Sequence, residues 1–494
     1  MSDVVLGVDV GSTDTKVVAA TRSGTVLGYA VTATRWTDRR GQRTETSADV
    51  VADDVLALLA GVLLELPAWS AARQVRVAAI GITGMGESGV LVDDRGRPTH
   101  PMIAWHDARG EAEILDLGIT AEFRGRTGLP VSALPTVAKL AWLGRNGVQL
   151  SGRTWLGLPE YVAFRLGAAP AAELSLVSRT GLLDQDTRAP WPQILDRIDA
   201  GPDLLPPFVR AGSPLGRAGD AAVPHELAGA VITVAGHDHC VAAVGAGAAG
   251  PGTAFHSVGT AQVLVRPVEG ATTCASRERL AANGIDSVTH VLDSRPVLVA
   301  GTRTGLLMRR ALAMVGATAD PQRAALDSAA LSLALRDTLD GVHVSGARDD
   351  DGCLRILVDG DDVSPAALWA AVLIHDRAEV ARLLRLMETE VGPFSDTVVA
   401  GGWTRMRSVR AAKQRALPAV TFCDREQVGA FGAALFAAHA AALAEVPAFE
   451  FDLDAPLSPS PSAAFVAAFT APADVDADRA SPLGGPHLSP SKGV

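Results

Sequence analysis

The sequence predicts an α/β protein built from two domains, each a mixed β-sheet flanked by helices. The chain has 494 residues, more than one compact hydrophobic core normally serves. Short apolar runs alternate with turn residues and with amphipathic stretches of helix length in both halves. Each half also opens with a strand, a glycine turn and a second strand, which indicates an old duplication with a cleft between the halves. We place the domains at 1–234 and 235–450, followed by a C-terminal extension at 451–494.

The first half begins with hairpin-linked strands and continues with a helix and another strand. Gly-rich and Ser-Gly turns separate the apolar runs, which is typical of hairpins. A helix is predicted from Ser47, a good N-cap residue, because apolar side chains recur after it at helical spacing. That apolar stripe consists of Val51, Val55, Leu58, Leu59 and Val62. The predicted strands are Val4–Val8, Val17–Ala20, Val26–Val31 and Val75–Ile82.

The second half repeats the opening and then adds long helices. Its longest predicted helix runs from Ser364 to about Glu390, because Ser364 is a suitable N-cap and Pro365 suits the first helical position. Further helices are predicted from Ser408 and from Gln427. The predicted strands are Thr253–Ser257, Gln262–Val265, Thr397–Ala400 and Ala419–Phe422.

Composition and charge exclude several classes of protein. Hydrophobic residues make up 48% and charged residues 20%, as in an ordinary globular protein. The net charge of -11 argues against a nucleic-acid partner, which requires clustered Lys and Arg. The net charge is compatible with a nucleotide ligand, because backbone N–H groups and a divalent cation can neutralise the charge of its phosphates. From about residue 471 the chain is rich in Pro, Ser, Gly and Asp, which predicts a mobile tail.

The cysteines and the N-terminus indicate a cytoplasmic protein. The four cysteines, at positions 240, 274, 353 and 423, form no CxxC pair and are expected to be reduced thiols. The opening MSDVVLGVDV lacks the basic and apolar regions of a signal peptide. No uncharged apolar run is long enough to span a bilayer, so we expect no membrane partner.

A turn between the first two predicted strands has the residues of an anion site. Gly11, Ser12 and Thr13 expose backbone N–H groups and hydroxyls, and Lys16 adds a positive charge. Asp9, at the end of the first strand, can hold Mg²⁺ through water. The alternative interpretation is a hairpin with ordinary turn residues, because short motifs of this kind are not specific.

Asp238 lies where a strand at Val231–Val234 leads into a helix. A carboxylate there can accept the proton of a substrate hydroxyl, but it can equally be a helix-start residue favoured by the helix dipole. Its neighbours His237, His239 and Cys240 do not match a familiar zinc spacing, so we interpret them as packing or supporting residues.

Three glycine segments in the second half need separate interpretation. Residues 245–250 match GxGxxG, but they lie late in a helix-like run and lead to a strand, so we interpret them as close helix packing. The pairs Gly259-Thr260 and Gly401-Gly402 each follow a strand. They suit phosphate and adenosine contacts respectively, although ordinary turn chemistry also explains them.

Residues 81–109 combine a glycine-rich loop with a cluster of polar and aromatic residues. Glu87 lies in the loop, and Trp105, His106 and Asp107 follow close to Arg109. Polyol recognition uses carboxylates for adjacent hydroxyls and an aromatic face, which this segment supplies. The alternative is a solvated loop with a salt bridge between Asp107 and Arg109.

These segments, in this order, resemble the FGGY family of carbohydrate kinases, relatives of actin, hexokinase and the heat-shock ATPases. The resemblance extends from residue 4 to about residue 445. The segments that carry it are GVDVGSTDTK, GITGMGES with AWHDARG, LPEYVAFRLG with SLVSRTGLLD, GHDHCVAAVGAG, SVGTAQVLV, VVAGGWTRMRS and EQVGAFGAALFA.

The resemblance implies two ribonuclease H-like (actin-like ATPase) domains, with the active site in the cleft between them. It implies phosphorylation of a small-molecule sugar or polyol by ATP with Mg²⁺, and Asp238 as general base. The activity it implies is xylulokinase-like, with a glycerol or polyol kinase as the alternative to a ketopentose kinase. The oligomeric state stays open, with a homodimer as one candidate. The implied nucleotide or phosphate contacts are Gly11, Ser12, Thr13, Lys16, Gly259, Thr260, Gly305, Gly401 and Gly402, with Asp9 for the metal. The implied substrate contacts are Glu87, Trp105, His106, Asp107 and Asp238.

Departures from the family pattern leave the substrate open. The loop GMGES, which carries Glu87, matches neither the histidine-bearing loop typical of xylulokinases nor the glutamate-bearing loop of glycerol kinases neatly, and His106 replaces an Asn or Gln. The adenosine turn GGWTRMRS is also bulkier than expected. Two rival hypotheses remain. One is a non-catalytic sugar or nucleotide sensor on the same fold, and the other is a chaperone-like ATPase, against which the WHDAR segment counts.

Overall fold

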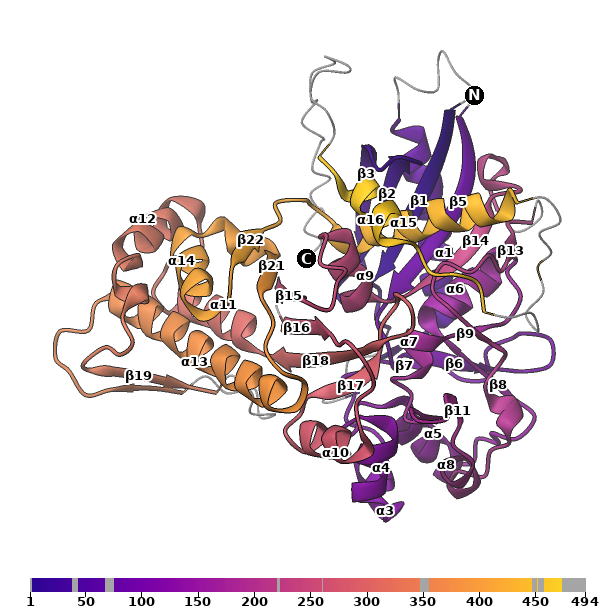
Figure 1. The fold of residues 1–494 in the computed structure, drawn as a ribbon, viewed down its shortest axis with the longest axis horizontal. Helices are drawn as coiled ribbons and strands as arrows, with labels where there is room; N and C mark the ends of the chain where they lie inside the picture. The colour runs from indigo at the N-terminus through magenta and orange to yellow at the C-terminus, as the bar shows by residue number, and fades with distance from the viewer. Residues whose placement is uncertain are drawn as a thin grey trace.

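The computed structural model contains two six-stranded mixed sheets, one in each half of the chain (Figure 1). It describes residues 2–37, 43–66, 75–219, 223–259, 261–346, 355–446, 451 and 457–472. Helices flank both sheets, so the predicted α/β class is confirmed.

The first sheet has the order β13-β14-β5-β1-β2-β3. Strands β1, β2 and β3 are antiparallel, β5 and β14 lie parallel to β1, and the short edge strand β13 is antiparallel to β14. The first three strands form the predicted hairpins, and β5 and β14 join β1 in parallel. Strand β1 is almost continuously apolar, as expected for a strand covered on both faces. The strands are β1 (Ser2–Val10), β2 (Asp14–Thr21), β3 (Val26–Ala33), β5 (Val75–Gly84), β13 (Gly216–Arg217) and β14 (Val231–His237).

Two helices cover one face of this sheet, α1 (Ala48–Leu64) and α6 (Leu158–Leu166). Helix α1 begins after Ser47, as predicted, although the Ser47 side chain makes no capping hydrogen bond. It buries four of the five predicted stripe residues, and Leu58 is partly buried against the same core.

The other face carries α9 (Asp238–Gly245) and α15 (Val428–Ala444). Glycines allow this close packing, because a Cβ on Gly7 would overlap the Ala430 carbonyl and one on Gly81 would overlap that of Ala433. A Cβ on Gly245 would likewise overlap the backbone of Val428. The GxGxxG segment is therefore a helix-packing feature at this position, as predicted.

The second sheet has the order β17-β18-β16-β15-β21-β22, and its last five strands repeat the arrangement of β3, β2, β1, β5 and β14 in the first sheet. Again a run of antiparallel strands is extended by parallel ones at one side. The repeated order supports the duplication inferred from the sequence. The strands are β15 (Thr253–Val258), β16 (Gln262–Pro267), β17 (Asp286–Thr289), β18 (Pro296–Thr302), β21 (Asp396–Ala400) and β22 (Val420–Phe422).

Long helices flank the second sheet, and the longest begins where predicted. The Ser364 hydroxyl accepts a hydrogen bond from the Ala367 N–H at 3.2 Å, which caps this helix. The helices are α11 (Thr304–Met314), α12 (Asp320–Ala330), α13 (Pro365–Val391) and α14 (Arg407–Ala416).

Smaller elements complete the described residues. Most of them lie between β5 and β14, where the chain leaves the first sheet. They are β4 (Glu45–Thr46), β6 (Gly89–Val92), β7 (Met102–Ile103), α3 (Glu111–Asp116), α4 (Thr120–Thr127), α5 (Thr136–Arg145), β8 (Thr154–Gly157), β9 (Ala172–Glu173), α7 (Leu174–Val177), β10 (Leu183–Asp184), β11 (Ala189–Pro190), α8 (Pro192–Arg197), β12 (Phe208–Val209), α10 (Cys274–Ala282), β19 (Val342–Ser345), β20 (Arg355–Val358) and α16 (Ala463–Thr470).

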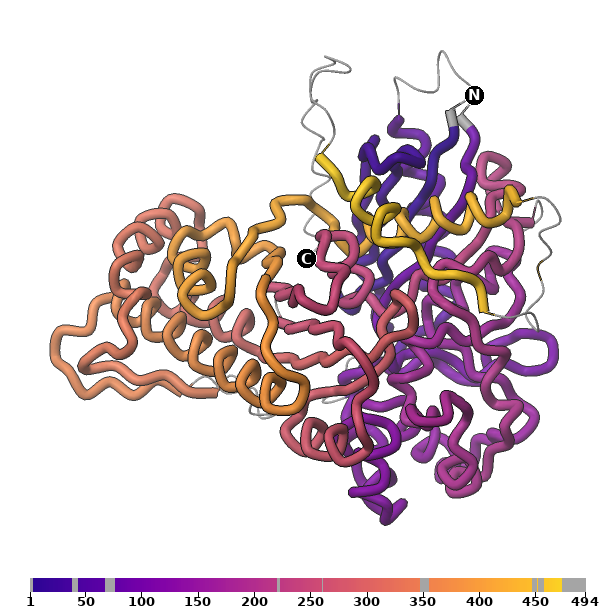
Figure 2. Tube along the Cα trace, viewed as in Figure 1, coloured from indigo at the N-terminus to yellow at the C-terminus, as the bar shows by residue number. Residues whose placement is uncertain are grey.

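The chain returns to its first half near the C-terminus. Helix α15 falls in the range 235–450 that we predicted for the second domain, yet it packs on the first sheet (Figure 2). Helix α16 belongs to the predicted extension and packs on α15, where the Phe469 and Phe431 ring centroids are 5.2 Å apart. The predicted tail lies outside the described residues from position 473 onward. Within the described part, no helix is both long and apolar enough to cross a membrane.

Candidate active site

Asp238 is the first residue of α9, directly after β14, as the sequence predicts. Hydrogen bonds from both sides hold this junction. The Thr83 hydroxyl donates to the Gly236 carbonyl at 2.5 Å, and the His237 N–H donates to the Ser175 hydroxyl oxygen at 2.9 Å. The place of the carboxylate is therefore determined by the end of a buried strand.

The Asp238 carboxylate is partly exposed, with 23% of the side chain accessible. Its Oδ1 accepts the His239 N–H at 2.6 Å and lies 3.3 Å from His237 Nε2. Burial lowers the pKa of His237 well below its usual value, so the ring is neutral. No Lys or Arg pairs with Asp238 among the residues that the structure describes. An accessible carboxylate without a cationic partner can accept a proton.

Asp9 lies at the end of β1, the central strand beside β5. Lys16 Nζ is 3.6 Å from Asp9 Oδ2, and Oδ1 is buried without a hydrogen-bond partner in the described chain. Burial raises the pKa of Asp9, the charge of Lys16 opposes that rise, and the negative charge of Asp238 adds to it. Two nearby carboxylates and an unpartnered buried oxygen suit a hard divalent cation.

The predicted phosphate turn joins β1 to β2, and the segment after β3 supports it. The Gly11 N–H donates to the Asp14 carbonyl at 3.1 Å, and the Thr34 N–H donates to the Thr13 carbonyl at 2.9 Å. Trp36 Nε1–H donates to the Ser12 carbonyl at 2.8 Å. Sequence reasoning missed Trp36, because a lone tryptophan after a strand has no spacing that marks it.

The two predicted nucleotide turns of the second half meet each other. Gly259 follows β15, and Gly401 follows the neighbouring strand β21. Gly401 has a φ of 125°, and a Cβ there would overlap the carbonyl of Val258, beside Gly259. Gly402 begins a short 3₁₀ helix that ends at Arg405. Thr260 lies outside the described residues.

Gly305 lies in the first turn of α11. The helix begins at Thr304, so Gly305 is buried in the first turn. Its predicted nearness to a nucleotide stays a prediction.

Glu87 occupies a loop after β5 with an unusual backbone, since its φ is 54°. Its Oε1 accepts from Arg179 Nε at 2.6 Å, and Arg179 Nη2 contacts Asp286 Oδ2 at 2.9 Å. Burial raises the pKa of Glu87, and the positive charge of Arg179 opposes that rise. The sequence did not single out Arg179 or Asp286, although Arg179 stands in the SLVSRTGLLD segment.

The Trp105–Asp107 segment has aromatic neighbours on one side. The ring centroids of Trp105 and His106 are 5.3 Å apart, and those of Trp36 and His106 are 6.2 Å apart. Trp36 therefore links the phosphate turn to the predicted substrate segment.

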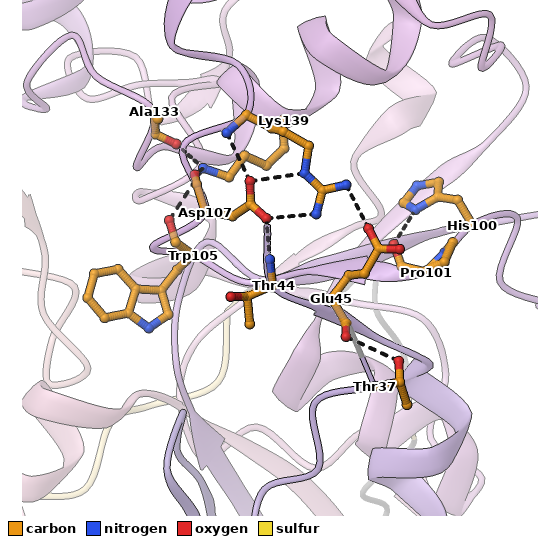
Figure 3. A network of polar contacts seen from close by, with 10 residues as sticks. Thr37, Thr44, Glu45, His100, Pro101, Trp105, Asp107, Ala133 and Lys139 are labelled. Atoms are coloured by element: carbon orange, nitrogen blue, oxygen red, sulfur yellow. Dashed lines mark hydrogen bonds and ion pairs between the residues drawn. The ribbon is translucent and has the colours of Figure 1, made fainter. Parts of the chain in front are cut away.

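Asp107 lies in a closed polar network (Figure 3). Only 1% of its side chain is exposed. Arg109 donates to Oδ1 from Nε at 2.9 Å and to Oδ2 from Nη2 at 2.7 Å, and the Thr44 N–H donates to Oδ2 at 2.7 Å. Although burial disfavours the charge, these hydrogen bonds lower the pKa of Asp107. The carboxylate is occupied by the protein itself, which favours a positioning role over direct contact with a sugar.

Lys139, on α5, fixes the same segment from the other side. Its ammonium donates to the carbonyls of Asp107 at 2.7 Å and Trp105 at 3.3 Å, and to that of Ala133 (Figure 3). Burial lowers the pKa of Lys139 to about 8. The segment that bears Trp105 and His106 is thus held on both sides by charged groups.

No cluster of three or more His, Cys, Asp or Glu side chains suited to a metal occurs in the described part of the chain. Cys240, Cys274 and Cys423 are free thiols, as predicted, whereas Cys353 lies outside the described residues.

The repeated sheets, with carboxylates at the ends of β1 and β14, define a protein of the actin-like ATPase fold. Residues 4–245 match the N-terminal domain of the FGGY family of carbohydrate kinases. This part of the chain belongs to that family, and the predicted resemblance is confirmed.

Curated relatives match this chain over only part of their length. An L-fuculokinase of Salmonella typhi is 30% identical over 272 residues, covering 53% of this chain and 56% of that protein. A xylulose kinase of Streptomyces coelicolor is 32% identical over 196 residues, covering 38% of this chain and 40% of that protein. The chain thus matches about half the length of these relatives, or less.

Solved structures match over nearly the whole chain. A xylulose-type kinase of Brucella ovis has a TM-score of 0.75 at 21% identity, covering 94% of this chain and 96% of that one. A Plasmodium falciparum glycerol kinase with ADP has a TM-score of 0.77 at 16% identity, covering 88% and 89%. At these identities the likeness establishes the fold, and the predicted fold class is confirmed.

Proposed function

We propose that the protein transfers a phosphoryl group from ATP to a hydroxyl of a sugar or polyol, with Asp238 as general base. The observation that carries this proposal is the Asp238 carboxylate. It is partly exposed at a strand–helix junction, next to a neutral histidine and without a cationic partner in the described chain. A carboxylate in that state is ready to accept a proton.

In this proposal the substrate hydroxyl lies against Asp238 while its oxygen attacks the γ-phosphorus of ATP. The new O–P bond forms as the bond to the ADP oxygen breaks, and Asp238 receives the hydroxyl proton. Phosphoryl transfer needs little covalent chemistry from the protein, so the work of the chain is to position groups and stabilise charge. The rigid end of β14 suits that task.

The nucleotide would lie along the glycine turns. The turn at 11–13, Lys16, Gly259 and the Gly401-Gly402 pair are the proposed contacts, and Thr260 and Gly305 stay predictions. A hydrated Mg²⁺ held near Asp9 and Asp238 would neutralise phosphate charge. The unpartnered Oδ1 of Asp9 supports that position.

The substrate would be held by Glu87 and by the aromatic surface of Trp105 and His106. We place Asp107 behind this surface as a positioning residue, because its oxygens already accept four hydrogen bonds. The identity of the sugar is an open choice among ketopentoses, deoxy sugars, aldonates and glycerol, since relatives are named as xylulose kinase, L-fuculokinase, gluconokinase and glycerol kinase.

The experiment is a coupled ADP-release assay over a panel of ketoses, deoxy sugars, aldonates and polyols, followed by Asp238→Asn with the best substrate. We expect kcat to fall by about 10²–10⁴-fold while nucleotide binding persists. Asp320→Asn is a matched control, because Asp320 also begins a helix but is 94% exposed on its side chain. It should stay within about twofold of wild type.

The outcomes separate the hypotheses. Near-normal turnover in Asp238→Asn would refute the general-base assignment. Sugar binding by the wild type without ADP release for any panel member would favour the non-catalytic sensor. ADP release that does not depend on any sugar would favour the chaperone-like ATPase.

A further inference from the structure

Arg179 contacts one carboxylate from each half of the molecule. It follows α7 in the first half, and its Nε donates to Glu87 Oε1 at 2.6 Å. Its Nη2 donates at 2.9 Å to Oδ2 of Asp286, which begins the edge strand β17 of the second sheet. A single guanidinium therefore joins the proposed substrate acid to the second domain.

This network is largely removed from solvent. The exposed fractions of the side chains are 11% for Arg179, 8% for Glu87 and 17% for Asp286. Surface ion pairs contribute little, but a buried carboxylate that loses its cation is strongly destabilised. The ring of His237 cannot replace Arg179 as a cation, because burial keeps it neutral. Lys139 adds a longer-range electrostatic interaction with Glu87, and Arg179 is the cation that contacts its carboxylate directly.

The Glu87 loop is shaped to receive this guanidinium. A Cβ on Gly86 would lie 3.1 Å from Arg179 Cδ and 3.1 Å from His237 Cδ2, so a larger residue would crowd both side chains. Glu87 itself has a φ of 54°, and its carbonyl accepts from the Thr136 hydroxyl at 3.1 Å. Left-handed backbone at a glutamate persists only where its surroundings hold it.

Strand β17 is docked on the first half by its backbone. The Ser287 N–H donates to the Gly128 carbonyl at 2.8 Å, and the Thr289 N–H donates to the Ser178 hydroxyl oxygen at 3.1 Å. Asp286 therefore reaches Arg179 only while the second sheet keeps its place beside residues 125–128 and 178. The two ion pairs of Arg179 coexist in this arrangement of the halves.

We propose that Arg179 is a positioning residue that couples sugar binding at Glu87 to the approach of the nucleotide-binding half, through Asp286. This inference rests on the proposed function. A sugar that binds Glu87 fixes that side chain and also the Arg179 guanidinium paired with it. The fixed guanidinium then favours the docked position of β17 through Asp286. In this proposal the nucleotide binds with β17 in that position. Such coupling is reciprocal, so bound sugar should raise the affinity for nucleotide, and nucleotide should raise the affinity for sugar by the same factor.

The test compares Asp286→Asn with Asp186→Asn. Asp186 pairs with Arg277 Nη2 at 2.7 Å. This ion pair also joins the two halves, but it does not involve Glu87, so Asp186→Asn is a matched control. Isothermal titration gives the Kd of a non-hydrolysable ATP analogue with and without the sugar found in the panel, and also the Kd of the sugar alone. Thermal unfolding monitors folding, and Arg179→Lys is the second variant if Asp286→Asn does not fold.

We expect Asp286→Asn to lose about fivefold or more of the coupling factor while its affinity for sugar alone changes by less than about twofold. Asp186→Asn should keep the wild-type factor. Unchanged coupling in Asp286→Asn, or an equal loss in Asp186→Asn, would overturn the inference while phosphorylation by the wild type upholds the proposed function. If the wild type neither binds nor phosphorylates any sugar, the proposed function and this inference are both refuted.

Discussion

Asp238 and Asp107 are carboxylates of the same predicted site, yet the protein treats them differently. The side chain of Asp238 is 23% exposed and lies beside a neutral ring, whereas that of Asp107 is 1% exposed and accepts hydrogen bonds from Arg109 and Thr44. Both residues follow strands and stand in motif-like segments. The difference teaches that a carboxylate is available for chemistry when it accepts few hydrogen bonds from the protein itself.

The largest effect that tests this comparison is expected from Asp107→Asn. Asp107→Asn removes one carboxylate of a buried ion pair and leaves Arg109 with Glu45, at 2.6 Å, as its acidic partner. Because the second carboxylate remains, we expect a loss of unfolding free energy of about 3 kcal/mol, at the lower end of the range for a broken buried pair. Denaturant unfolding would measure the loss. The kcat of the molecules that remain folded should change far less than in Asp238→Asn.

The opposite pattern would break the comparison. If Asp107→Asn unfolds like wild type but loses the sugar, its carboxylate contacts substrate directly. Asp93→Asn is a suitable control, because Asp93 also accepts bonds from a nearby arginine and from backbone N–H groups, but its partner Arg97 is 66% exposed.

The sequence predicted local features well, because residues close in the chain determine them. The start of α13 at Ser364, the apolar stripe of α1 and the place of Asp238 at a helix start all follow from short patterns. The network around Asp107 could not be predicted, because Thr44 is 63 residues away in the chain. The same holds for Arg179, whose partners Glu87 and Asp286 are 92 and 107 residues away.

The packing between the two halves could not be predicted from the sequence either. Helix α15 follows the second sheet in the chain but covers the first, where Gly7 and Gly81 let its backbone approach. A glycine within a strand has several explanations, so neither residue could indicate which helix would lie against it. The predicted range of the second domain therefore included a helix that packs elsewhere.

A smaller effect is expected from Lys139, whose ammonium donates to the Asp107 carbonyl. Burial lowers the pKa of Lys139 to about 8, below the value of about 10.4 in an unfolded chain. Between these values the unfolded state binds more protons, so the contribution of Lys139 to stability rises with pH. It should rise by about 2 kcal/mol from pH 7.5 to pH 10.

The measurement is the difference in unfolding free energy between wild type and Lys139→Met across this pH range. Other groups titrate in both proteins and cancel in the difference. A flat difference would mean that the buried ammonium does not titrate there, and a difference that falls with pH would reverse the assigned direction of the shift. Arg145→Met, at the end of the same helix but on a surface pair, should give no pH-dependent difference.

The smallest effect is expected from Trp36, which lies between the phosphate turn and His106, the neighbour of Asp107. Its Nε1–H donates to the Ser12 carbonyl at 2.8 Å, and its ring lies 6.2 Å from that of His106. Trp36→Phe removes the hydrogen bond and keeps an aromatic ring, which costs about 1 kcal/mol. We expect the KM for ATP to rise about fivefold with kcat nearly unchanged, because the phosphate turn loses one support.

Trp191→Phe also removes an indole hydrogen bond, to Gln193, and should leave the KM for ATP as it is. A rise in the KM for sugar instead would contradict this prediction and would mean that Trp36 acts on the substrate segment through His106.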